Sequence, residues 1–152
     1  MLGLGFTYDL SYSIMVIVVE IHIKTNKSRN LRDITGVKTM RVANKNARQY
    51  VDELKVFEGS NTFAENKVSF DDENLYVVYS YGYHFPMYIY DRQAGIWIGS
   101  NDSYSVSTSK QQSQCRPSGK IHCWLDTAEE MKEYIKCGSM MKYMEIKAKR
   151  VA

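Results

Sequence analysis

Residues 75–100 decide the fold, and they read LYVVYSYGYHFPMYIYDRQAGIWIGS. Three short runs of valine, isoleucine and aromatic residues occur at 75–81, 87–90 and 96–98, and segments containing glycine, proline or aspartate separate them. Branched and aromatic residues favour strands, whereas the separating residues favour turns. We therefore predict three consecutive antiparallel strands, each joined to the next by a short turn.

The strand pattern continues beyond this stretch. Residues 104–109, YSVSTS, alternate strictly, with Tyr104, Val106 and Thr108 on one face and three serines on the other. Such alternation is typical of a half-buried strand. Residues 121–125, IHCWL, alternate in the same way. Together these segments predict a twisted antiparallel β-meander.

Two segments have the spacing of helices instead. Within residues 43–57, apolar residues recur on one face of a helix. That stripe comprises Ala47, Tyr50, Val51, Leu54 and Phe57. A second helix is predicted at residues 128–137, with Thr127 and Glu130 as a capping box and Gly138 as the stop. Its inward residues would be Ala128, Met131, Tyr134 and Ile135. We expect the two or three helices to pack on one side of the meander, which gives an α+β fold.

A chain of 152 residues has the size of one domain, and we predict a single domain over residues 1–152. Residues 14–23, IMVIVVEIHI, are too few to cross a bilayer and predict a buried strand. We interpret residues 1–14 as an N-terminal extension. Residues 139–152 form a basic tail, which the sequence leaves open as helix or strand.

Composition narrows the function classes. Twenty basic and 17 acidic residues give a net charge of +3, which is low for a dedicated duplex-DNA binder but compatible with a small basic patch. Three cysteines cannot all pair within the chain, so we expect a reducing cytoplasm. His122 and Cys123 are neighbours that would point to opposite faces of a strand, and no CxxC pair is present. We therefore predict no metal and no cofactor.

Residues 61–117 carry a distinctive series of motifs. It begins with Asn61-Thr62-Phe63 and continues with Tyr79-Ser80-Tyr81-Gly82, His84, Pro86, Tyr104-Ser105, Thr108-Ser109-Lys110, Ser113-Gln114 and Pro117. This series resembles an uncharacterised family of small phage and prophage proteins. The core of that family is a Tyr-Ser-Tyr-Gly-x-His-x-Pro element followed by a Tyr-Ser-x-Thr-Thr-Ser-Arg-His-x-Ser-Gln element. The resemblance implies a phage origin, hence the cytoplasm of an infected bacterial host, and no established activity.

The chain departs from the family pattern at three positions. Ser107 stands in place of threonine, Lys110 in place of arginine and Gln111 in place of histidine. A mechanism that needs a second histidine at position 111 is therefore not carried over to this chain.

Two groups of polar residues are candidates for a site. In the meander, His84 shares one end with Asn101 and Asp102, and we expect His84 to order its turn by bonding to Asp102. Tyr104, at the start of the next predicted strand, is a further candidate for this group. The second group has side chains suited to phosphate contacts. It comprises Lys110, Gln111, Gln114 and Arg116. Because successive turns of a meander lie at alternate ends, we expect the two groups to be roughly 13–20 Å apart.

These observations favour a non-enzymatic binding module, with a host protein or single-stranded nucleic acid as its partner and no membrane partner. A role in host takeover or anti-defence would fit such a module. The alternative is a small metal-independent nuclease or hydrolase in which His84 is the acid or base and Lys110 or Arg116 stabilises a phosphate. The chain has no P-loop, no Rossmann fingerprint and no nucleophile elbow, which favours binding over catalysis. The sequence predicts no oligomeric state.

Overall fold

The computed structural model describes residues 39–69, 72–103 and 105–151, which belong to one compact unit. The strand expected at residues 14–23 and the extension expected at residues 1–14 lie outside the described residues. Tyr104 lies outside them as well.

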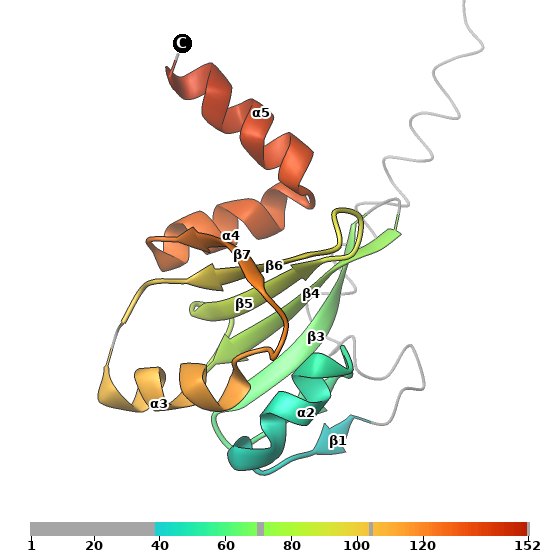
Figure 1. Cartoon of the computed structure of the whole chain (residues 1–152), viewed down its shortest axis with the longest axis vertical. Coiled ribbons are helices and arrows are strands. Elements are labelled where there is room, and N and C mark those ends of the chain that lie inside the picture. Colours follow the sequence, from blue (N-terminus) through green and yellow to red (C-terminus); the bar gives the residue numbers. More distant parts are fainter. Residues whose placement is uncertain (1–38, 70–71, 104, 152) are drawn as a thin grey trace, which may run out of the picture. The chain divides into compact units, whose positions relative to one another are not determined.

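The described residues form one sheet of seven strands, which lie in the order of the chain (Figure 1). The strands are β1 (Met40–Arg41), β2 (Phe57–Glu58), β3 (Thr62–Ser69), β4 (Asp72–Ser80), β5 (Pro86–Asp91), β6 (Ile96–Ser100) and β7 (Ile121–Leu125). From β2 to β6 each neighbouring pair is antiparallel, so the predicted meander forms the centre of the sheet. The pairs β1–β2 and β6–β7 are parallel. The sheet is therefore mixed, whereas the sequence predicted an antiparallel one.

Helices lie on both faces of this sheet, although the sequence predicted them on one (Figure 1). They are the 3-10 turn η2 (Asn44–Asn46) and the helices α2 (Ala47–Asp52), α3 (Val106–Cys115), α4 (Ala128–Cys137) and α5 (Met140–Val151). Val51 of α2 and Cys115 of α3 belong to one core, and Tyr134 of α4 and Tyr143 of α5 belong to the other. The fold is α+β, as predicted, with the sheet as its middle layer.

Strand β4 shows why both faces are covered. Tyr76 and Val78 point into the α2–α3 core, whereas Leu75, Val77 and Tyr79 point into the α4–α5 core. All five side chains are at most 2% exposed. An uninterrupted apolar run is typical of a strand that is buried on both faces. The run LYVVY therefore requires a covering layer on each side of the sheet.

The strand predicted at residues 104–109 is wrong, because Ser105 caps a helix, α3, that begins at Val106. The Ser105 hydroxyl begins the helix by accepting the Thr108 amide at 3.2 Å. The buried residues of α3 are Thr108, Gln111 and Cys115, which have helical spacing. Two of these three are polar, so a search for apolar periodicity finds no helix here. The helix carries the chain across to β7, which therefore runs parallel to β6.

The helix predicted at residues 128–137 is confirmed as α4. The Thr127 hydroxyl accepts the Glu130 amide at 3.2 Å, and Gly138 ends the helix with a φ of 74°. The Glu130 carboxylate accepts the Asp126 amide at 3.0 Å, so the reciprocal bond of the capping box is displaced by one residue. The basic tail is a helix, α5, and it is tied to α4 by an ion pair of 2.7 Å between Lys147 and Glu130.

The helix predicted within residues 43–57 is shorter than expected. It ends at Asp52, because Leu54 adopts a left-handed φ of 51° and turns the chain. Phe57 consequently lies in β2. All five residues of the predicted apolar stripe still pack in or against the α2–α3 core. The periodicity identified the buried side chains correctly but overestimated the length of the helix.

One buried carboxylate joins the sheet to the C-terminal helices. Asp91, the last residue of β5, has no exposed surface. Its Oδ2 accepts the Tyr134 hydroxyl of α4 at 2.6 Å and the Met140 amide of α5 at 3.0 Å. Its Oδ1 accepts the Ala94 amide of the β5–β6 turn at 2.9 Å. Three donors compensate the carboxylate for its lost hydration, so Asp91 fixes α4 and α5 against the sheet.

We predict that Asp91→Ala lowers the free energy of unfolding by about 3 kcal/mol or more, because each buried donor left unpaired costs about 1–3 kcal/mol. Tyr134→Phe removes a single bond to the carboxylate and should cost about 1.5–3 kcal/mol. Urea denaturation followed by circular dichroism measures both. Glu53→Ala, at an exposed carboxylate, is the control and should change little. Wild-type stability of Asp91→Ala would disprove the assigned role.

Candidate functional site

A pocket of about 380 Å³ opens at the tip of the β4–β5 hairpin, and residues from the first turns of α3 and α4 also line it. The residues that line it are Ser80, Tyr81, His84 and Phe85 of the hairpin, Asp102, Ser105 and Thr108 before and within α3, and Ala128, Glu129 and Lys132 of α4. Pockets of this volume accommodate small ligands or single groups of larger ones. Three separate elements therefore form this site.

The hairpin tip holds Tyr81 in an unfavourable backbone conformation. Its φ is 57°, and the left-handed region costs a residue other than glycine about 1–2 kcal/mol. The Tyr81 amide donates to the Asn61 carbonyl at 2.7 Å, which holds the backbone in place. The side chain remains 54% exposed at the pocket. Because strained residues concentrate at functional sites, Tyr81 makes the hairpin tip a candidate site.

His84 is exposed on the same turn. Its ring lies against Gly82, where an added Cβ would be 3.0 Å from the imidazole Nδ1. The expected bond between His84 and Asp102 does not form among the described residues, and Asp102 Oδ2 accepts the Ala128 amide at 3.1 Å. Asn101 lies at this end of the sheet but is absent from the described lining. His84 and Asp102 therefore share a pocket without a hydrogen bond between them.

The second predicted group lies closer to the first than expected. Gln111 is buried, and its side-chain oxygen accepts a hydrogen bond from the Ser80 hydroxyl at the hairpin. The predicted separation assumed a strand in place of α3, and it is wrong for Gln111 because the helix folds back beside the hairpin. Lys110 and Arg116 are exposed and Gln114 is half-buried. These three side chains do not line the pocket.

Helix α4 adds two charged residues that the sequence did not single out. Glu129 and Lys132 form an ion pair of 3.1 Å beside the pocket. The hydrogen bond from Lys132 lowers the pKa of the Glu129 carboxyl, so this group is ionised at neutral pH. Both residues belong to a helix that was predicted correctly. No local signal indicates that the start of this helix lies beside the hairpin.

A separate group of cations lies around α3. Helix α2 packs beside α3, and Arg48 donates to the Ser113 carbonyl at 2.9 Å. The exposed basic residues of η2, α2, α3 and the loop after α3 form what we call the α3 basic surface. They are Lys45, Arg48, Lys110, Arg116 and Lys120. Between Asp102 and Asp126 the chain contains no acidic residue.

None of the five cations of the α3 basic surface forms an ion pair within the described residues. Elsewhere, six basic residues pair with a carboxylate: Lys55, Lys67, Lys132, Lys147, Lys149 and Arg150. Arg92, Lys136 and Lys142 also form no ion pair within the described residues, but they do not lie in one group around a single helix. Of the nearby acids, Asp52 accepts the Ser118 amide and hydroxyl, both at 2.7 Å, and Glu53 pairs with Lys55. The α3 basic surface is therefore available to an external anion.

The cysteines are not suited to nucleophilic catalysis. Burial raises the pKa of Cys115 to about 12 and also raises the pKa values of Cys123 and Cys137. The thiols therefore stay protonated at neutral pH, whereas the thiolate is the nucleophile. Among the described residues, no group of three or more His, Cys, Asp and Glu side chains is arranged to hold a metal ion.

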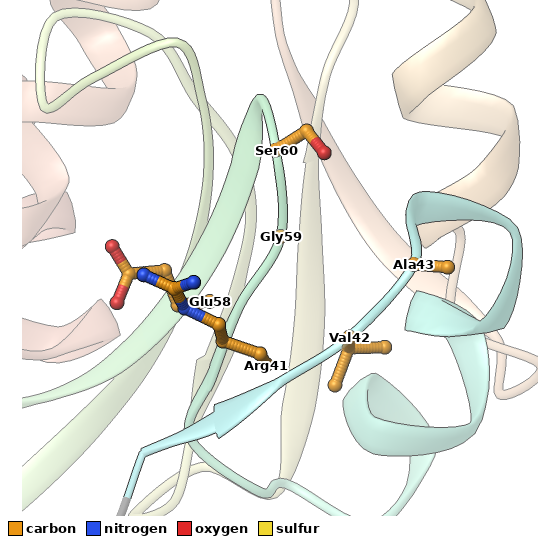
Figure 2. A pocket seen from close by; sticks show the side chains of 6 residues that line it. All are labelled: Arg41, Val42, Ala43, Glu58, Gly59 and Ser60. Carbon is orange, nitrogen blue, oxygen red and sulfur yellow. The ribbon is translucent and has the colours of Figure 1, made fainter.

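A second cavity, of about 390 Å³, lies beside β1 and the turn after β2 (Figure 2). Arg41 and Glu58 are partners in the β1–β2 pair, and Figure 2 shows their side chains together on one side of the strands. Gly59 fits tightly here, since an added Cβ would be 2.5 Å from Asn44 Oδ1. The described lining contains no imidazole and no aromatic ring. We assign no site to this cavity.

The fold and the site define an α+β protein whose mixed sheet lies between helices, with a pocket at one hairpin tip and a basic surface around α3. The chain matches no family model, no curated protein and no solved structure. No helix in the described part of the chain is long and apolar enough to cross a membrane. The function must therefore be inferred from the residues themselves.

The strain at Tyr81 generates a prediction. Tyr81→Gly should leave the free energy of unfolding unchanged or raise it by up to about 1 kcal/mol, because glycine adopts a positive φ without steric cost but loses more entropy on folding. Tyr81→Ala keeps the strain and serves as the comparison. Chemical denaturation of both variants provides the measurement. A glycine variant much less stable than the wild type would show that Tyr81 is held there by its packing.

Proposed function

We propose that the protein is a non-enzymatic binding module whose α3 basic surface binds single-stranded nucleic acid. The observation that carries this proposal is the set of five exposed cations around α3, none of them paired with a carboxylate within the described residues. An unpaired cation can neutralise a phosphate and release the counterions of the nucleic acid. Cations that already hold a carboxylate would have to break that pair first.

The surroundings of these cations favour a single strand over a duplex. Arg116 lies over the Trp124 ring at 5.7 Å, and Trp124 is 39% exposed. Exposed aromatic rings beside cations are suited to stacking with unpaired bases. Ser109 and Ser113 are exposed on α3, and hydroxyl groups of this kind contact sugars and phosphates.

The cellular setting rests on the resemblance carried by residues 61–117. We infer from it a phage or prophage origin and a role in the cytoplasm of an infected bacterium, in host takeover or anti-defence. A host protein is the alternative partner. It would replace the proposed one if the α3 basic surface shows no affinity for nucleic acid.

A second candidate function is a metal-independent nuclease centred on His84. The observation in its favour is that His84, Ser105 and Lys132 line one pocket, which removes the expected separation between the imidazole and a cation. We favour binding because Lys132 is already paired with Glu129 and because His84 has no carboxylate that orients it among the described residues. Loss of labelled RNA in the presence of the protein, abolished in a folded His84→Ala variant, would establish the nuclease instead.

The salt dependence of binding tests the proposed function. We expect the affinity for a single-stranded RNA of eight or more nucleotides to fall with salt, with a slope of about −0.7 per phosphate contact on logarithmic axes. Lys110→Ala with Arg116→Ala should make this slope shallower by about 1.4. Fluorescence anisotropy between low and physiological salt is the measurement.

The matched control is Lys147→Ala with Lys149→Ala, which removes the same charge from α5, where both lysines are ion-paired. This variant should keep the wild-type slope. Equal effects of the two double variants would show that net charge, and not the α3 basic surface, governs binding. Absence of binding at low salt would reject the nucleic-acid function altogether.

A further inference from the structure

We infer that the pocket at the tip of the β4–β5 hairpin receives one unpaired base of the strand held by the α3 basic surface. This inference rests on the proposed function and extends it to base selection. Helix α3 connects the two places, because Ser105 and Thr108 line the pocket at its start and Arg116 follows its last residue. The eight helical steps from Thr108 to Arg116 span about 12 Å, so a strand of a few nucleotides reaches both places.

The pocket has a wall suited to a flat ring. Tyr81 is 54% exposed at the pocket, whereas Phe85, which also lines the pocket, is 5% exposed and is part of the core. An exposed aromatic ring provides a stacking surface, and unpaired bases are recognised by stacking on such rings. The left-handed φ of Tyr81 has a steric cost that glycine would avoid. The tyrosine at this position therefore does not favour folding, and its aromatic ring is better explained by a role in binding.

The rim of the pocket is rich in hydrogen-bond acceptors. The Asp102 carboxylate accepts the Ala128 amide at 3.1 Å through Oδ2, its only side-chain hydrogen bond within the described residues. Glu129 holds Lys132 through Oε1 at 3.1 Å, and its side chain is 78% exposed. Within the described residues, neither Asp102 Oδ1 nor Glu129 Oε2 accepts a hydrogen bond from another residue, so these oxygens can accept one from a ligand. Two carboxylates and one already paired ammonium make the rim a better acceptor than donor.

This rim distinguishes bases by their exocyclic groups. Cytosine and uracil have the same size, but cytosine has an amino donor at the ring position where uracil has a carbonyl acceptor. A carboxylate accepts a hydrogen bond from the amino group and is repelled by the carbonyl oxygen. The pocket should therefore prefer a base with an exocyclic amino group, and cytosine against uracil is the cleanest comparison.

The test uses fluorescence anisotropy at one fixed low salt concentration. It compares the affinities of the full chain for two eight-nucleotide RNAs, oligocytidylate and oligouridylate. The wild type should bind oligocytidylate about 10-fold more tightly, the discrimination typical of one well-placed base contact.

Glu129→Ala should reduce this ratio of affinities to about 2 or less. Glu145→Ala removes an equally charged carboxylate that is also paired on a helix, but outside the pocket, and should keep the ratio. Tyr81→Gly should lower the affinity for both RNAs about 10-fold without changing the slope of affinity against salt concentration.

The outcomes separate this inference from the proposed function. If both RNAs bind equally, or if Glu129→Ala and Glu145→Ala have the same effect, the pocket does not select a base, while salt-dependent binding to the α3 basic surface stands. If neither RNA binds, the inference is overturned together with the proposed function. Circular dichroism of each variant confirms that loss of selectivity is not loss of folding.

Discussion

The buried carboxylate of Asp91 is the interaction on which the arrangement of the C-terminal half depends. A buried carboxyl group is stable in a protein interior only when hydrogen-bond partners surround it, and here they come from the β5–β6 turn, from α4 and from α5. The bond between the Tyr134 hydroxyl and this group helps to fix the position of α4 on the sheet. That position brings the first turn of α4, with Glu129 and Lys132, to the hairpin tip. A contact at one end of the sheet thus positions residues of the pocket at the other.

Buried hydrogen bonds also fix the position of helix α3, on the opposite face of the sheet. Its buried side is largely polar, and the hydrogen bond between Gln111 and Ser80 attaches it to the end of β4. Gln112 adds two bonds from its side-chain amide, to the Ser100 and Asp102 carbonyls. Polar attachments specify one geometry, because any other would leave buried donors and acceptors unpaired. The pocket is therefore enclosed by two helices that are each anchored by hydrogen bonds to the central strands.

Some of the described basic residues form ion pairs with carboxylates, and others do not. On α4 and α5, Lys147 and Arg150 pair with Glu130 and Glu133, and these contacts join one helix to the other. Lys136 and Lys142 of the same helices form no ion pair among the described residues, and neither do the exposed cations around α3, where Arg116 lies over the Trp124 ring. Paired charges contribute to packing, whereas unpaired cations contribute little to folding and remain available for a ligand. A net charge of +3 does not show this division, because it averages over both faces.

The sequence by itself determined the elements whose signals are local. The run LYVVY predicts a buried strand from five adjacent residues, and Thr127 and Gly138 mark the ends of α4 through bonds within one turn. It also placed His84 and Asp102 at one end of the sheet, since the antiparallel order of β4 to β6 follows from short turns. The tertiary structure alone decided that residues 106–115 form a helix, because the partner of Gln111 lies 31 residues away and the buried face is polar. It alone brought Glu129 and Lys132 to the hairpin, and it gave Lys110 and Arg116 no carboxylate partner within the part of the chain that is described. Such facts depend on which distant groups meet, and periodicity along the chain carries no information about that.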